Sequence, residues 1–152
     1  GGGGAGAAGQ ASQSSNGGKG GNGAICNVLN TTQANTENVG EVSGSDVYYA
    51  GGGGGSPSAT DNGGLGGASG ASQNNDNATD ATANTGGGGG GGRNADDTTN
   101  VYGGAGGSGV IILKYPDSYT ISGVGVTFGN TYSNAGYKVT PITQGTGTVS
   151  FN

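Results

Sequence analysis

The stretch Gly86-Gly-Gly-Gly-Gly-Gly-Gly92 decides what kind of fold this chain can adopt, because seven successive residues carry no side chain. Glycine loses more conformational entropy on ordering than any other residue, so a long run is ordered only where side chains must be absent. Five more glycine-rich runs cover residues 1–9, 17–23, 51–55, 63–70 and 103–109. Their recurrence at similar lengths favours a repeated structural element over flexible linkers, which are the alternative explanation of such a composition.

Glycine supplies 41 of the 152 residues, whereas Val, Ile, Leu and Phe are sparse, so side-chain packing cannot stabilise the whole chain. Collagen needs glycine at every third position and abundant proline, and the sequence has neither. Another structure that needs glycine is a close-packed bundle of polyglycine II helices, which are left-handed with three residues per turn. We expect a non-helical fold, meaning one without α-helices. Residues 1–109 are expected to form a bundle of polyglycine II rods joined by polar loops.

The pattern changes after Gly109. Val110-Ile-Ile-Leu-Lys-Tyr115 is a β-branched apolar run, and shorter alternating segments follow it as far as Phe151, separated by Gly, Asn and Pro. Such segments are typical of short strands and hairpins. We therefore expect a small all-β segment over residues 110–152 as a second domain. No stretch combines a helical apolar period with caps, and no α-helix is expected.

Charge and composition argue against several classes of partner. The net charge is −5 and the four basic residues are scattered, so no patch can neutralise a run of phosphates, and nucleic acid is not expected. No stretch approaches the roughly 18 apolar residues of a membrane span. The lone Cys26 can form neither an intrachain disulfide nor a thiolate cluster. Because the chain has no Met and starts at Gly1, we expect a processed product or part of a longer protein.

No catalytic constellation is found in the sequence. The chain has no His, Cys26 has no base partner, and no Ser lies in a nucleophile elbow. Carboxylate pairs such as Asp96-Asp97 would need an apolar pocket to raise one pKa for glycosidic chemistry, and the surrounding loops contain almost nothing apolar. The cluster Asn74-Asn-Asp-Asn77 suits calcium, but ordinary turn chemistry accounts for it. We expect no enzyme activity, no metal and no cofactor.

The passage Gly103-Gly-Ala-Gly-Gly-Ser-Gly-Val-Ile-Ile-Leu-Lys-Tyr-Pro116 and the terminal Gly-Thr-Gly-Thr-Val-Ser-Phe151 resemble the carboxy-terminal parts of glycine-rich bacteriophage fibre and tail proteins. The run-and-loop section is similar to the polyglycine-helix tip adhesins on the long tail fibres of T-even-like phages. In those adhesins, loops that join the glycine helices touch the bacterial receptor. The resemblance implies an extracellular virion location, host attachment and a homo-oligomer, a trimer by analogy. The chain departs from the adhesins in placing a β-rich segment after the glycine runs.

If consecutive glycine rods run antiparallel, their loops alternate between the two ends of the bundle. Loops 10–16, 56–62 and 93–102 then share one end, which we expect to be the free, receptor-binding tip. The amino terminus, loops 24–50 and 71–85 and the β segment are expected at the other end. The predicted receptor contacts are Gln13, Asp61, Arg93, Asp96, Asp97 and Tyr102.

Tyr48 and Tyr49 form a second candidate patch, because aromatic rings in polar loops stack on the apolar faces of sugars. The alternative is that they cover the edge of the glycine bundle. Together these observations predict a virion fibre or tail-fibre protein whose loops recognise a bacterial surface glycan or outer-membrane protein, without membrane insertion. The competing hypothesis is a purely structural filament subunit that pairs exposed strand edges with neighbouring subunits and has no specific ligand.

Overall fold

The computed structural model describes residues 1–12, 17–55, 63–71, 76–93 and 100–152. Regular secondary structure is mostly β-strand and lies in two parts of the chain, residues 24–49 and 111–151. The described glycine-rich segments contain no helix or strand. The elements are β1 (Ala24–Ile25), α1 (Thr31–Glu37), β2 (Glu41–Ser43), β3 (Asp46–Tyr49), β4 (Ile111–Pro116), β5 (Ile121–Phe128), β6 (Tyr132–Asn134) and β7 (Tyr137–Phe151).

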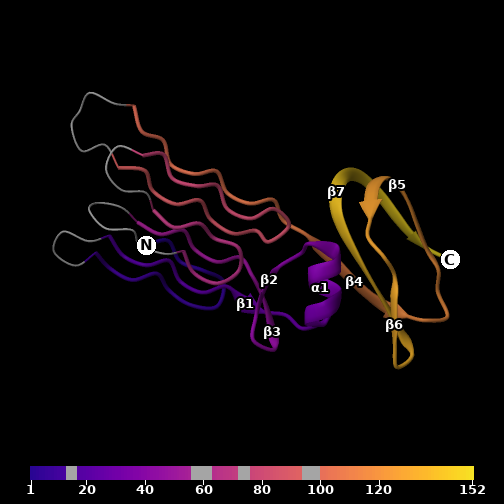
Figure 1. The fold of residues 1–152 in the computed structure, drawn as a ribbon. Coiled ribbons are helices and arrows are strands. Elements are labelled where there is room, and N and C mark those ends of the chain that lie inside the picture. Colours follow the sequence, from indigo (N-terminus) through magenta and orange to yellow (C-terminus); the bar gives the residue numbers. More distant parts are fainter. Residues whose placement is uncertain (13–16, 56–62, 72–75, 94–99) are drawn as a thin grey trace.

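The strands form two antiparallel sheets at one side of the glycine-rich segments, which run side by side away from them (Figure 1). The first sheet has the order β1-β3-β2. The second has the order β4-β7-β5, and β6 also pairs with β7. The first part of β7 pairs with β4 and β6, and its last part pairs with β5. β7 therefore holds the second sheet together.

The predicted bundle of polyglycine II helices is wrong. The regular elements are two antiparallel sheets and one short helix, and the described residues contain no polyglycine helix. A polyglycine II rod keeps the same negative φ along its length. Residues 63–70, predicted as one rod, instead reverse at a turn over residues 65–67, where Gly66 and Gly67 have φ of 110° and 81°. Residues 1–9 also double back, since the Gly4 N–H donates to the Ala7 carbonyl at 2.9 Å.

Main-chain hydrogen bonds join glycine-rich segments that lie far apart in the sequence. Gly21 donates to Gly2, Gly52 donates to Gly21, and Gly64 donates to Gly52, each with an N···O distance of 2.9 Å. Similar bonds run from Gly88 to Gly51, from Gly104 to Gly90 and from Gly107 to Gly87. We call the described residues within 1–23, 51–71 and 76–109 the glycine array. Backbone hydrogen bonds take the place of a side-chain core in this array.

The segments of the glycine array approach too closely for side chains. A Cβ atom on Gly20 would lie 1.7 Å from the Gly52 carbonyl oxygen, and one on Gly52 would lie 2.1 Å from the Gly2 oxygen. A Cβ atom on Gly89 would lie 1.9 Å from the oxygen of Gly104. Real Cβ atoms essentially never come within 3.0 Å of such atoms. Glycine at these positions is therefore required by the spacing between segments.

The prediction that the chain has no α-helix is also wrong. Helix α1 begins with a capping box, in which the Asn30 side chain accepts the Gln33 N–H at 2.9 Å and the Gln33 side chain accepts the Asn30 N–H at 3.0 Å. The helix ends at Asn38, which has the left-handed φ of 52° typical of a helix C-terminus. Its apolar face is short, because Ala34 is its buried residue.

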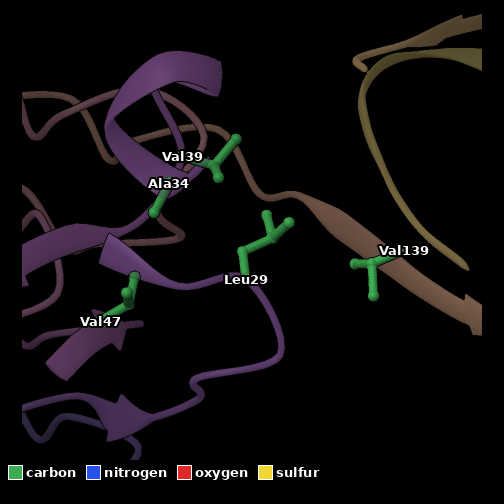
Figure 2. Packing of buried hydrophobic residues seen from close by; sticks show 5 residues of the cluster. All are labelled: Leu29, Ala34, Val39, Val47 and Val139. Atoms are coloured by element: carbon green, nitrogen blue, oxygen red, sulfur yellow. The ribbon is translucent and has the colours of Figure 1, made fainter. Parts of the chain in front are cut away.

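A small hydrophobic core joins α1 to both sheets. The buried cluster comprises Leu29, Ala34, Val39, Val47 and Val139 (Figure 2). The partly buried Ile112 of β4 and Tyr132 of β6 pack against it. The second sheet thus packs against the hydrophobic core of residues 24–49 through Val139, Ile112 and Tyr132. The domain boundary expected between residues 109 and 110 stays a prediction.

Glu37, the last residue of α1, bonds the helix to the second sheet. Its carboxylate accepts hydrogen bonds from the main-chain N–H and the side-chain amide of Asn130, and from the Tyr132 hydroxyl. Burial by itself raises the pKa of the Glu37 carboxyl, but the bonds from Tyr132 and Asn130 outweigh burial and hold the pKa below its usual value of 4.5. The same contact with Glu37 raises the pKa of Tyr132. The charged form of Glu37 therefore stabilises this junction.

Gly52→Ala is expected to lower the free energy of unfolding by about 1–3 kcal/mol, because the new methyl group meets main-chain oxygen rather than a movable side chain. Gly3→Ala is the matched control, since nothing lies within 4 Å of the position of its Cβ. Urea unfolding of both variants measures the difference. Equal stability of the two variants would contradict the close approach of the segments.

Glu37→Gln is expected to cost about 1 kcal/mol at neutral pH, because it removes a charged hydrogen-bond acceptor. Since the folded pKa of Glu37 is depressed, its contribution is present above the unfolded pKa and is lost as the pH falls through the folded pKa. Unfolding measured between about pH 3 and pH 7 should therefore show a weaker acid dependence in this variant. Asp117→Asn, which removes an exposed carboxylate, controls for net charge. An unchanged pH dependence in Glu37→Gln would argue against the junction.

Candidate functional site

Hydrogen bonds bring distant residues together at the end of the glycine array remote from the sheets. The Gly1 amino group donates to the Gln10 carbonyl at 2.8 Å, and the Gly55 N–H donates to the Gly18 carbonyl at 2.9 Å. Next to Gly55, the carbonyl of Gly54 accepts the Gly91 N–H at 3.0 Å. We call this region the loop end. Contacts among the neighbouring glycines bring together its described residues, which include Gly1, Gln10, Gly55, Ala71, Arg93 and Tyr102.

A second set of bonds joins the array at its opposite end, where it meets β1, β3 and the start of β4. Ala5 donates to the carbonyl of Ala50, Ala50 donates to Thr85, and Thr85 donates to Ser108, at 2.8–2.9 Å. We call this region the sheet end. Three segments of the array are thereby joined through Ala50, which directly follows β3, in one chain of main-chain bonds beside the sheets.

Glu41 of β2 attaches one turn of the array to the first sheet. Its carboxylate oxygen Oε2 accepts the N–H groups of Gly66 and Gly67 at 2.6 and 2.8 Å. These two donors lie in the turn at which residues 63–71 reverse direction. Hydrogen bonds to an ionised carboxylate are stronger than those to a neutral acceptor. Glu41 therefore stabilises the turn that the polyglycine prediction missed.

The described residues beside loops 10–16, 56–62 and 93–102 lie at the loop end, as the alternation of segments predicts. The amino terminus was expected with the sheets, but it lies at the loop end because residues 1–9 double back. Residues 71–85 do not form a single loop at the sheet end. Ala71 lies beside Gly90 towards the loop end and Thr85 lies at the sheet end, because the turn over residues 65–67 adds a reversal.

Arg93 and Tyr102 are predicted contact residues that fall within the described part of the chain. Arg93 is half-buried, and the Tyr102 side chain is 64% exposed. A Cβ on Gly92 would lie 2.5 Å from the Tyr102 carbonyl, so the main chain next to Arg93 runs directly beside Tyr102. The structure thus brings these two residues to one part of the loop end. The remaining predicted contacts, Gln13, Asp61, Asp96 and Asp97, lie outside the described residues.

Two side chains that were not among the predicted contact residues, Asn77 and Asp80, position the segment containing Tyr102. The Asn77 side-chain oxygen accepts the Tyr102 N–H at 2.8 Å, and the Asp80 carboxylate accepts the Ala105 N–H at 2.7 Å. The Ala78 N–H also donates to the Tyr102 carbonyl at 3.0 Å. Asn and Asp signal local turn chemistry in a sequence, but here their partners lie 25 residues away. No local pattern could have revealed these bonds.

Tyr48 and Tyr49, the second candidate patch, are neighbours in β3. Tyr49 packs against the hydrophobic core, and its buried hydroxyl has no hydrogen-bond partner among the described residues. Burial, with a smaller contribution from Cys26, raises the pKa of Tyr49 to about 12. Tyr48 is half-buried, and successive strand residues point to opposite faces. Tyr49 thus packs on the core face, and a binding role for either ring stays a prediction.

One hollow in the array offers only the chemistry of the peptide backbone. A hollow of about 680 Å³ beside Gly2, Gly52 and Gly88 is lined only by glycine and alanine. It offers N–H and C=O groups but no side chain that could act as an acid, base or nucleophile. Within the described ranges, no three or more His, Cys, Asp or Glu residues gather where they could hold a metal ion. None of the helices described there is long and apolar enough to cross a membrane.

Main-chain hydrogen bonds, small side chains and polar turns characterise the glycine-rich part of this chain. The chain belongs to the family described as the glycine-rich domain, whose profile matches residues 1–116 and so extends through β4. The match agrees with the predicted glycine-rich character, and nothing in it concerns phage fibres. No curated protein and no solved structure matches the chain.

Asn77→Ala is expected to accelerate hydrogen exchange at the Tyr102 amide while leaving the Ala105 amide protected, because Asp80 still holds the latter. Asp80→Ala should have the reverse effect. Each variant is expected to cost about 1 kcal/mol of stability. Exchange followed by NMR measures both amides in one experiment. Equal acceleration of the two amides in both variants would show that the side chains do not act separately.

Proposed function

We propose that this protein is a non-catalytic component of a virion fibre or tail fibre, and that its loop end binds the surface of a bacterial cell. The observation that carries the proposal is the convergence of Gln10, Gly55, Arg93 and Tyr102 at one end of the array, remote from the sheets. A scaffold held by many backbone bonds that presents polar loops at one end is an arrangement commonly used for recognition. The resemblance of residues 103–116 to phage fibre proteins supports the virion assignment.

The side chains at the loop end suit a glycan or an outer-membrane protein. The exposed ring of Tyr102 can stack on the apolar face of a sugar, and the Arg93 guanidinium can bind a carboxylate through two hydrogen bonds. Asn77 fixes the main chain at Tyr102, which reduces the entropy lost when the ring is immobilised by a ligand. In this proposal Gln13, Asp61, Asp96 and Asp97 supply further amide and carboxylate contacts.

A purely structural filament subunit is the second candidate. The second sheet favours it, because β5 pairs with β7 and with no other described strand, which leaves one edge of β5 open. Such an edge is a template for pairing with another chain. The two candidates place the essential contacts in different parts of the molecule, so variants of the loop end separate them.

The double variant Arg93→Ala/Tyr102→Ala is expected to weaken binding of the labelled protein to bacterial cells by at least about tenfold, since Arg and Tyr are frequent binding hot spots. Cells from a panel of strains serve as the probe. Tyr119→Ala is the matched control, because this ring is 46% exposed but belongs to the segment between β4 and β5. Circular dichroism establishes that each variant is folded.

Loss of binding in the double variant with retention in Tyr119→Ala would support the proposal. Equal binding by the double variant and the unmodified protein would contradict the assignment of the loop end. Failure of the unmodified protein to bind any strain would contradict the adhesin function and favour the filament subunit.

A further inference from the structure

β5 and residues 142–151 of β7 form a two-stranded ribbon, and the outer edge of β5 pairs with no other strand of the described residues. The register runs from Ile121 opposite Phe151 to Phe128 opposite Ile142. Just before it, Thr120 and Asn152 exchange two main-chain hydrogen bonds of 2.9 Å. Hydrogen-bonded and non-hydrogen-bonded pairs alternate along an antiparallel ladder. The N–H and C=O groups of Ile121 and Gly123 therefore point away from β7, towards the open edge.

The open edge lacks the charged residues and prolines that often prevent strand pairing. Natural edges carry lysine, proline or inward-pointing charges. Neither strand of the ribbon contains a charged residue or a proline, over residues 121–128 and 142–151. Val124, in the middle of β5, is 77% exposed. The irregularities of the ladder lie after Val124, so residues 121–124 keep a regular register.

The distribution of charge favours a second copy of the chain as the partner at this edge. The net charge is −5, and every acidic residue lies at or before Asp117. Residues 118–152 contain a single charged side chain, that of Lys138. Two copies repel each other where their acidic parts meet, but their ribbons can approach without like charges in contact. An edge that meets its own counterpart also needs no complementary sequence in another protein.

We propose that β5 of one copy pairs antiparallel with β5 of a second copy, so that the two second sheets become one continuous sheet. The pairing uses the outward main-chain groups of Ile121 and Gly123, and it covers the exposed Val124 side chains of both copies. Because the same strand contributes from each side, the contact closes as a two-fold dimer. The inference is independent of the ligand at the loop end.

Val124→Lys tests the proposal, because it places a charge from each copy at the shared edge. The unmodified protein is expected to form a dimer whose fraction rises between about 1 µM and about 500 µM, measured by light scattering, and the variant should dissociate at least about tenfold more readily. Ser45→Lys, in the exposed turn between β2 and β3, adds the same charge elsewhere and should leave the dimer intact. Circular dichroism checks the fold, and Ser122→Lys replaces Val124→Lys if the latter unfolds.

A dimer that is lost in Val124→Lys and kept in Ser45→Lys supports the pairing. A monomer at every concentration, or an oligomer that Val124→Lys leaves unchanged, overturns it.

Discussion

Main-chain hydrogen bonds between glycine segments, at a spacing that excludes Cβ atoms, are the constraint on which the rest of the structure depends. Gly52 illustrates it, since its N–H donates to Gly21 while a methyl group at the same residue would overlap the carbonyl of Gly2. Cohesion of this kind needs many bonds, because each contributes only about 1 kcal/mol net. It also needs absent side chains, which explains why glycine recurs in runs rather than singly.

Side-chain hydrogen bonds attach the array to the first sheet, join α1 to the second sheet and fix the position of individual segments of the array. Glu41 attaches the turn at Gly66 and Gly67 to the first sheet, and Glu37 attaches α1 to the second sheet. Asn77 aligns the main chain at Tyr102. The two ends of the array consequently differ in character. The sheet end is continuous with the hydrophobic core, whereas the loop end carries the half-buried Arg93 and the exposed ring of Tyr102.

The sequence predicted the physical cause of the array better than its conformation. Repeated glycine runs indicate packing without side chains, but glycine accepts so many φ, ψ values that they do not specify a polyglycine helix or the turn at residues 65–67. Strands after Gly109 were predictable, because Val110–Tyr115 is a β-branched apolar run and apolar residues alternate in Val124–Phe128. Helix α1 was not predictable in this way, since its sequence signal is the capping pair Asn30 and Gln33 and its apolar periodicity is slight. Arg93 and Tyr102 were predicted as the two ends of one loop, whereas the bond from Asn77 to Tyr102 depends on a tertiary contact.

Amide hydrogen exchange of the glycine array, resolved by NMR, tests the central claim most directly. The relevant donors are Gly21, Gly52, Gly64, Gly88, Gly104 and Gly107. If main-chain bonds between segments hold the array together, these amides should be protected to a degree comparable with the amides of β7, and they should open together. Exchange of these glycines at the rate of an unfolded chain, while β7 stays protected, would contradict the account.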